Sequence, residues 1–345
     1  MTAVRPLTGR ELQRSVLARQ LLLTRTRSSI PAALERVGGL QAQYAPAMYV
    51  GLWSRVEGFT RTDLTTALER RDVVQGTLMR STIHLVSKRD YWPFALAVRA
   101  SRREWWVQTY RVDPAEMRSA ARRVRRALGA HGVLPGRELD RIAGATARNG
   151  IGLWIDLVRV PPSGTWDRRR ADLFALAEDW IGPPPDVSAP DAITHLVRRY
   201  LQAFGPSSTT EISLWAGMNA DNVDTALASL RLRAFLAEDG ERLVDLPRQP
   251  LPGAEADAPV RFLSTWEALL LVHARRALLI REEDRSRIFA KTMPQSKPTF
   301  LVDGQVAGTW RHVDERVEIE PFRRLSAPSR RAVEAEAARL VRVFE

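Results

Sequence analysis

The chain has 345 residues, and 45% of them are hydrophobic, which is enough for two to four domains with buried cores. The absence of cysteine excludes disulfides, cysteine-ligated zinc, iron–sulfur clusters and a cysteine nucleophile. The formal net charge is +12, and all of the 52 basic residues except Lys88, Lys291 and Lys297 are arginine. This surplus favours a polyanionic partner, most simply nucleic acid. An anionic membrane surface fits less well, because no basic helix carries a strongly apolar opposite face.

No segment of the sequence predicts secretion or a membrane span. The N-terminal residues MTAVRPLTGREL lack the apolar core of a signal peptide. The longest apolar stretch, residues 268–280, is interrupted by His273, Arg275 and Arg276. Together with the lack of cysteine, these features favour the reducing environment of the cytoplasm.

The start of the chain has the pattern of a winged helix, in which three helices precede a β-hairpin. Thr8 begins a capping box, and Pro31 suits the first turn of a second helix. A third helix is expected to begin at Thr60 or Thr62. Residues 77–86, TLMRSTIHLV, alternate in hydrophobicity and predict a strand.

The same order of elements returns twice, which predicts two further modules of this kind. Each ends in a turn that suits a wing, Pro161-Pro162-Ser163-Gly164 in the second module and Asp239-Gly240 in the third. The helices are expected at residues 115–128, 137–147, 191–204, 209–217 and 220–232.

Beyond residue 248 the pattern changes toward strands. Residues 249–259 have the composition of a linker, and Asp303-Gly304 lies between two short β runs. We expect residues 317–319 to pair beside this hairpin and residues 328–344 to form a closing helix. The predicted fold is therefore α+β, with three tandem winged-helix modules, each a helix-turn-helix plus a β-hairpin, and a C-terminal β-rich domain. The predicted boundaries are 1–112, 113–188 and 189–248 for the modules and 249–345 for the C-terminal domain.

Two glutamines, Gln41 and Gln43, are the first candidates for chemistry. They follow an amphipathic helix and Gly38-Gly39, where the backbone can pass close to another group. A neutral amide cannot take a proton at neutral pH, but it can hold a water or a sugar hydroxyl in place. That suits a reaction whose leaving group is already activated. The other interpretation is that they are ordinary polar residues at a helix end.

Arg80, Thr82 and His84 alternate along the predicted strand, so their side chains are expected on one face. They could line a phosphate site or an active-site pocket. The alternative is a solvent-facing edge of a wing.

Arginine clusters are the candidate phosphate contacts. One lies on the predicted helix 115–128 and the other in the wing of the second module, and either could also serve solubility. The residues proposed to contact nucleic acid are Arg122, Arg126, Arg168, Arg169 and Arg170.

No motif indicates a metal or a cofactor. The five histidines have neither HxH nor HExxH spacing, and no Walker loop, no GxGxxG after a strand and no GxSxG is present. Asp167, Asp172, Glu178 and Asp179 are better explained by a solvated wing and helix face than by a metal site or a glycosidase pair. We therefore expect neither a cofactor nor a metal.

Several longer motifs are spread from about residue 8 to residue 322. They are LARQLLL, GLQAQ with YVGLWSR, LMRSTIHLVS, VPPSGTW, FGPSSTTEISLWAG, DRSRIF, FLVDGQVAGTW and VEIEPF. With these motifs the chain resembles the AlkZ/YcaQ-type bacterial DNA glycosylases over nearly its whole length. LMRSTIHLVS and FLVDGQVAGTW are specific, whereas QAQ gains meaning because it falls where the family has its catalytic Gln-x-Gln or Gln-x-Asp.

The resemblance implies three tandem winged helices held by a C-terminal β domain, and a catalytic pair at Gln41 and Gln43. It further implies a monofunctional glycosylase that releases cationic N7- or N3-alkylated purines, including interstrand crosslinks. The partner would be double-stranded DNA carrying alkylated or crosslinked purines, and we expect a nucleoid-associated monomer. This chain has Gln43 where other members of the family have Asp. In this respect it is similar to the crosslink-resistance branch, which is often linked to antibiotic producers. The link ARRALLIREE, residues 274–283, is longer than the family pattern, so it leaves the geometry of the C-terminal domain open.

Two other functional classes are alternatives to a glycosylase. A winged-helix transcriptional regulator would dimerise and bind a symmetric operator through a recognition helix, which three modules in one chain fit poorly. A non-enzymatic DNA-binding protein would have the same charge and fold without base release.

Overall fold

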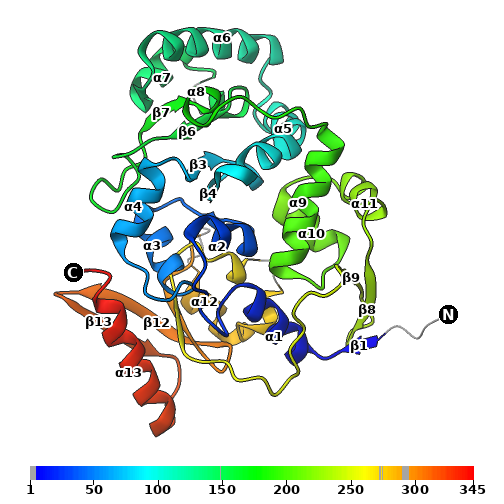
Figure 1. The fold of residues 1–345 in the computed structure, drawn as a ribbon, viewed down its shortest axis with the longest axis vertical. Coiled ribbons are helices and arrows are strands. Elements are labelled where there is room, and N and C mark those ends of the chain that lie inside the picture. Colours follow the sequence, from blue (N-terminus) through cyan, green and yellow to red (C-terminus); the bar gives the residue numbers. More distant parts are fainter. Residues whose placement is uncertain (1–4, 148, 272, 274, 290–294) are drawn as a thin grey trace.

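The structure of the chain, a computed structural model, describes residues 5–147, 149–271, 273, 275–289 and 295–345. Helices and strands alternate in groups, with α6 and α7 at one end of the molecule and the C-terminal helix α13 at the other (Figure 1). The predicted α+β class is confirmed. No helix in the described ranges is both long and apolar enough to cross a membrane.

The first module contains the three predicted helices, a hairpin and two helices that were not predicted, one before the hairpin and the long α5 after it. Thr8 and Thr60 each form the reciprocal hydrogen bonds of a capping box, and Pro31 lies in the first turn of its helix, as expected. The first of the two additional helices, α3, follows the two glutamines directly. The elements are α1 (Gly9–Arg19), α2 (Ile30–Val37), β2 (Leu40–Gln41), α3 (Ala45–Trp53), α4 (Arg61–Glu69), β3 (Val73–Thr77), η1 (Met79–Ser81), β4 (Ile83–Ser87) and α5 (Lys88–Tyr110).

The prediction of one strand over residues 77–86 is wrong. The chain turns at η1, where Arg80 and Ser81 have φ of 51° and 58°. The Leu78 N–H donates to the Thr82 carbonyl at 2.9 Å and closes the turn. The alternation of apolar residues arises because the turn also buries its apolar side chains, including Met79.

The second module shares a sheet with the first. Its strand β6 pairs with β3, with Gln75 opposite Arg159, so the hairpins of both modules form one six-stranded sheet in the order β2-β4-β3-β6-β7-β5. Figure 1 shows α6 and α7 covering the far side of this module. The elements are α6 (Pro114–His131), β5 (Leu134–Pro135), α7 (Gly136–Ala143), η2 (Ile151–Leu153), β6 (Leu157–Arg159), β7 (Leu173–Leu176) and α8 (Ala177–Ile181).

The third module has the predicted hairpin at Asp239-Gly240, and a strand from the N-terminus extends it. Strand β1 (Arg5–Leu7) runs parallel to β8, and helix α9 packs against α5. The Arg19 guanidinium and the Asp245 carboxylate, both fully buried, join α1 to this module at 2.8 Å. The elements are α9 (Ala189–Phe204), α10 (Thr209–Ala216), α11 (Ala220–Ala228), β8 (Arg233–Ala237) and β9 (Arg242–Asp245).

The C-terminal domain is an antiparallel sheet in the order β10-β11-β12-β13, with the predicted hairpin at Asp303-Gly304 and the predicted closing helix. Several short helical turns lie between β10 and β11 in the chain, and one of them, η5, packs against α1. The elements are β10 (Arg261–Leu263), η3 (Ala268–Leu270), η5 (Arg276–Leu278), η6 (Glu282–Asp284), α12 (Arg285–Ile288), β11 (Thr299–Val302), β12 (Gln305–Val313), β13 (Arg316–Pro321) and α13 (Ala327–Val341).

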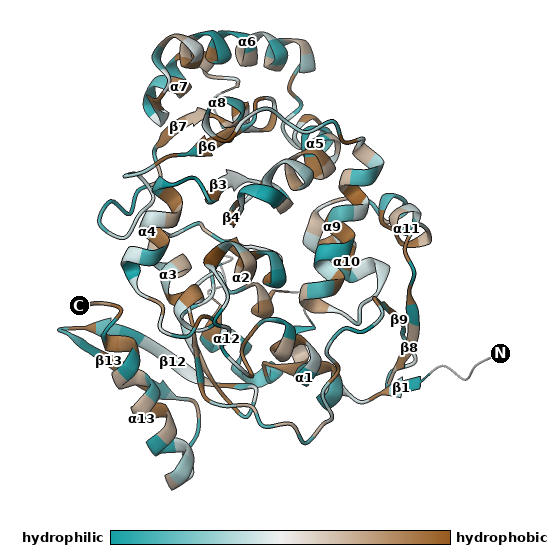
Figure 2. Ribbon diagram, viewed as in Figure 1, coloured by the Kyte–Doolittle hydropathy of each residue, from teal (hydrophilic) through white to brown (hydrophobic). Residues whose placement is uncertain are grey.

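Apolar residues gather between the modules as well as inside them. The largest core joins α5 of the first module to α9 and α10 of the third, and buries Phe94, Tyr200 and Trp215. Figure 2 shows hydrophilic stretches on α6, whose inner side buries Met117 and Val124 in the core of the second module. The packed contacts between α5 and α9 fix the third module relative to the hairpin of the first.

Candidate active site

The short strand β2 brings the two glutamines to the edge of the shared sheet. Gln41 lies opposite His84 of β4, and the Ala42 N–H donates to the Ile83 carbonyl at 2.7 Å. This approach requires the positive φ of 83° at Gly39, where a Cβ would lie only 3.0 Å from the Leu85 carbonyl oxygen. The glycine pair therefore has the close-approach role expected of it.

Gln43 is exposed and is held by the backbone of β4. Its Oε1 accepts a hydrogen bond from the Ile83 N–H at 2.8 Å. A side-chain carbonyl oxygen has a second lone pair, and the amide nitrogen has two N–H groups. Because Gln43 lines a cavity of about 450 Å³, these groups are available to a molecule bound there. The Gln43 amide is oriented and can still bind water.

Gln41 is buried next to Arg80. Its Oε1 accepts from the Arg80 Nη2 at the long distance of 3.5 Å, and its exposed fraction is 8%. Arg80 also donates from Nη1 to the backbone carbonyl of Trp215 at the end of α10. One half-buried guanidinium thus connects the third module to the first glutamine.

The cavity lies between the hairpin of the first module and the second module. Arg80 and Arg159 are the cations of its described lining, and burial lowers the pKa of each to about 10, so both remain charged at neutral pH. Asp140 is the only carboxylate in that lining. The net charge of this lining is therefore positive, which suits a polyanionic substrate.

His84 cannot act as an acid or a base near neutral pH. It is buried, and burial together with the nearby Arg80 charge lowers its pKa to about 3. Its Nδ1 lies 3.0 Å from the Thr82 carbonyl oxygen and must carry the proton, because a carbonyl only accepts. The neutral ring therefore secures the turn between β3 and β4.

Comparison with known proteins identifies the family. The chain matches the family described as DNA glycosylase AlkZ-like over residues 34–343. It belongs to this family. It is 22% identical over 364 residues to the interstrand DNA cross-link repair glycosylase of Streptomyces sahachiroi, covering 94% of each protein. The solved structure of Streptomyces sahachiroi DNA glycosylase AlkZ matches the fold with a TM-score of 0.81 and 21% identity, covering 98% of this chain and 97% of that one.

Membership of the AlkZ-like family confirms the resemblance found in the sequence and identifies the chain as an enzyme of the DNA glycosylase class. The solved AlkZ structure confirms the fold. The domain boundaries and the roles of individual residues stay predictions. Among the described residues, no group of three or more carboxylates and histidines could hold a metal ion.

The structure separates the three residues that the sequence placed on one face of a strand. That expectation is wrong, because Arg80 lies in a turn, Thr82 closes this turn and only His84 is in β4. The bonds of Arg80 and the burial of His84 favour positioning roles over phosphate contact. Thr82 is half-buried, and its hydroxyl donates to the Met79 carbonyl at 3.1 Å.

The arginines of α6 divide into two groups. Arg122 and Arg126 are exposed and remain proposed DNA contacts. Arg123 instead donates to the Ala143 carbonyl at the end of α7 at 2.8 Å, and Arg125 pairs with Glu178. The proposed contacts therefore lie on the outer side of the helix.

The wing of the second module lies near the glutamines. Arg168, Arg169 and Arg170 are exposed, and Arg169 donates to the hydroxyl of Tyr44 at 3.2 Å. Tyr44 directly follows Gln43 in the chain. Arg168 and Arg170 both pair with Asp172, at 3.2 and 3.6 Å. The hydrogen bond to Tyr44 thus brings this wing close to Gln43, although neither the wing arginines nor Arg122 and Arg126 are in the described lining of the cavity.

Aromatic residues near the glutamines are mostly structural. Tyr49 and Trp53 of α3 are buried and pack in the core, whereas Tyr44 is 41% exposed. Trp105 of α5 is 47% exposed and lines the cavity with Gln43. Of the adjacent pair Trp105 and Trp106, only Trp106 is buried.

Proposed function

We propose that this chain hydrolyses the N-glycosidic bond of cationic N7- or N3-alkylated purines in duplex DNA, including interstrand crosslinks. The observation that supports it most is the placement of Gln43 in a cationic cavity, where the backbone orients its amide and no described residue occupies the other hydrogen-bonding groups of that amide. The relative named as an interstrand DNA cross-link repair glycosylase supports the substrate class.

The chemistry follows from the charge of the lesion. Alkylation at N7 or N3 leaves the purine positively charged, which weakens the bond between the base nitrogen and C1′ of the sugar. The bond breaks with its electron pair going to the base, which leaves neutral and needs no proton from the enzyme. Water adds to C1′ and loses a proton to the solvent.

The protein has to orient water and stabilise positive charge on the sugar. Gln43 positions the water through the free lone pair of Oε1, which accepts a hydrogen bond from a water O–H. Gln41 lies beside it and is oriented by Arg80. An aspartate at position 43 would add an anion and a base, which less activated substrates require.

Crosslinked substrates favour an open site. A base tethered to the other strand resists extrusion from the helix, in contrast to the flipped base of many enzymes that act on nucleobases. The cavity lies between two modules, which supports an approach to the lesion from a DNA groove. We propose that a monomer acts in this way in the cytoplasm, in protection against a genotoxic alkylating natural product.

The test is base release from three duplexes, one with N7-methylguanine, one with an N7-linked interstrand crosslink and one undamaged. We expect release from the first two and none from the third. Protection of a palindromic site from nuclease without any base release would instead support the regulator considered from the sequence. Binding to all three duplexes without release would support a DNA-binding protein without this activity.

A further inference from the structure

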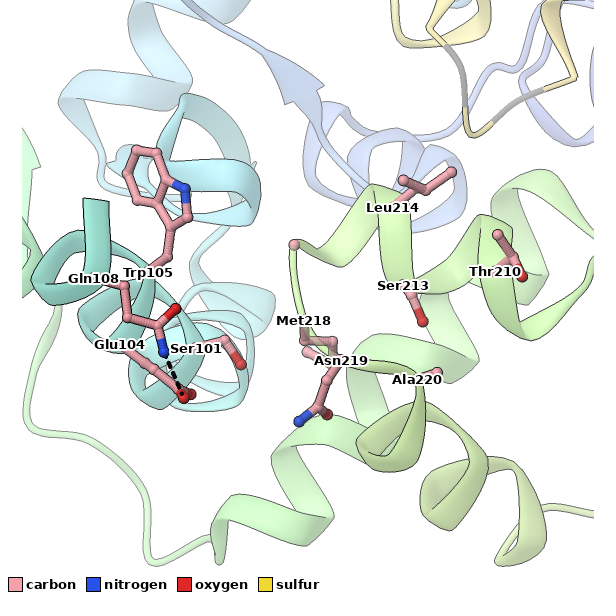
Figure 3. Close-up of a pocket in the computed structure, with 11 residues that line it drawn as sticks. Ser101, Glu104, Trp105, Gln108, Thr210, Ser213, Leu214, Met218, Asn219 and Ala220 are labelled. Carbon is pink, nitrogen blue, oxygen red and sulfur yellow. Dashed lines mark hydrogen bonds between the residues drawn. The ribbon is translucent and has the colours of Figure 1, made fainter.

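A second cavity of about 580 Å³ lies on the other side of Trp105. Figure 3 shows Ser101, Glu104, Trp105 and Gln108 projecting from α5, and Thr210, Ser213 and Leu214 lying across from them on α10. Trp105 lines both this cavity and the one that contains Gln43. The two cavities therefore share an aromatic wall.

The cavities also meet at the backbone. Gly217 in the second cavity contacts Arg80 in the first so closely that a Cβ on Gly217 would lie 3.1 Å from the Arg80 Cα. Because Trp105 lines both cavities, a ligand that lies along its indole would have one part beside Gln43 and the other between α5 and α10.

The walls of the second cavity select against phosphate. Its described lining contains Glu104 and neither arginine nor lysine. Exposed apolar surface faces it from both sides, because Trp105 is 47% and Leu214 is 46% exposed. The Ser213 hydroxyl is buried in the same wall and has no hydrogen-bond partner among the described residues. An uncharged or cationic planar group with a polar substituent fits this lining.

Trp105 is held in a fixed orientation. Its ring packs edge-on against Tyr110 at 6.1 Å between centroids and against Trp106 at 6.1 Å, and Trp106 is buried. A half-exposed indole that two neighbouring aromatic rings hold in place is suited to stacking.

We infer that the second cavity binds the planar, apolar substituent of a bulky alkylated purine, with Trp105 as the specificity-determining residue that the substituent stacks on. The inference rests on the proposed function, since it needs the alkylated base in the cavity of Gln43. It assigns small lesions to the first cavity alone and bulky lesions to both.

The experiment compares single-turnover release of N7-methylguanine with release of the N7-guanine adduct of aflatoxin B1 epoxide, which carries a planar fused-ring substituent. Leu214→Trp fills the second cavity from an exposed position, and Leu236→Trp, at an exposed leucine of β8, is its matched control. We expect Leu214→Trp to slow release of the bulky adduct about tenfold or more and release of N7-methylguanine less than about twofold. Leu236→Trp should change neither rate.

Substitution of the indole gives a second measurement that does not depend on filling the cavity. Trp105→Ala should also slow release of the bulky adduct about tenfold, and Trp105→Phe should restore most of it, because stacking needs an aromatic face. Parallel loss on both substrates in Leu214→Trp, or unchanged release of the bulky adduct in either variant, would overturn the inference while the proposed function stands. If the unaltered enzyme releases neither base, the proposed function fails, and the inference fails with it.

Discussion

Among the single residues of the candidate site, Arg80 connects Gln41, the end of α10 and the turn between β3 and β4. Its guanidinium contacts Gln41 and the Trp215 carbonyl, and its backbone adopts a φ of 51° that only the surrounding turn can maintain. A planar guanidinium reaches both partners at once, which an ammonium group on a flexible chain cannot do.

Arg80→Lys should therefore slow the release of N7-methylguanine about tenfold, although the positive charge is kept. The measurement is the single-turnover rate at saturating enzyme, with DNA affinity and the unfolding temperature recorded in parallel. Arg122→Lys, at an exposed position, is the control and should leave the rate unchanged. An unchanged rate in Arg80→Lys would show that charge alone is required there.

The buried His84 should make the folded protein less stable in acid. Its folded pKa of about 3 is below the ordinary value of 6.5, so the unfolded state binds more protons between these values. Stability should consequently fall as the pH is lowered below about 6.5, by about 2 kcal/mol from this residue between pH 7 and pH 5. Denaturant unfolding at the two pH values tests this, because His84→Gln should reduce the pH dependence and His131→Gln, at an exposed position, should not. Equal pH dependence in both variants would contradict the assignment.

The place of the glutamine pair after a helix could be predicted from the sequence of GLQAQ, whereas its catalytic role, inferred from the matching position of the family motif, stays a prediction. The position of Arg80 in a turn could not be predicted. Alternating apolar residues are typical of a strand, and nothing in LMRSTIHLV shows that two residues without a glycine adopt positive φ in a turn. The environment that maintains this turn comes from α10, about 135 residues later in the chain.

At the scale of elements, the position of strand β2 depends on Gly39. A Cβ there would lie 2.8 Å from the Val86 Cγ1 and 3.0 Å from the Leu85 carbonyl oxygen, both in β4. Gly58 has a similar φ of 70°, but a Cβ there would meet no atom within 4 Å. Alanine at either position would thus have to adopt an unfavourable positive φ, but only alanine at Gly39 would also clash with neighbouring atoms.

Gly39→Ala should lower the free energy of unfolding by at least about 1 kcal/mol more than Gly58→Ala, because β2 must shift away from β4. The same shift displaces both glutamines, so base release should slow in Gly39→Ala and remain unchanged in Gly58→Ala. Denaturant unfolding and single-turnover kinetics on the two variants test both statements. Equal effects of the two substitutions would show that only the backbone conformation matters.

The pairing of strands from different modules could not be predicted from the sequence. The Asp239-Gly240 and Asp303-Gly304 turns were correct because a turn depends on local residues. The pairing of β3 with β6 joins strands about 80 residues apart in the chain. The alternation of apolar and polar residues shows which face of a strand is buried, but it does not show which strand lies beside it. The wall between the two modules, where the cavity of Gln43 lies, could therefore not be located in advance.

At the scale of the whole molecule, the net charge of +12 should appear as salt-dependent DNA binding. If Arg122 and Arg126 contact phosphates, replacing both with glutamine should reduce the slope of log affinity against log salt by about 2. The loss should be similar for damaged and undamaged duplexes. Glutamine at the exposed Arg330 and Arg331 of α13 is the matched control. Equal slopes in both double variants would remove α6 from the DNA interface.

The order of modules was predictable at this scale, but their assembly was not. Strand β1 pairs with β8 of the third module, so the two ends of the winged-helix region are joined. No local pattern in the first residues indicates that partner. The large apolar core between α5 and α9 likewise arises from helices that each have an ordinary amphipathic pattern.

Two uncharged amides are proposed to suffice for the departure of a cationic base. The single-turnover rate of N7-methylguanine release by Gln43→Ala and Gln41→Ala tests this directly, with duplex affinity measured on the same preparations. We expect the rate to fall about a hundredfold in Gln43→Ala, because water at C1′ loses its orientation, and to fall less in Gln41→Ala, with DNA binding retained in both. Unchanged rates in both variants would contradict the claim.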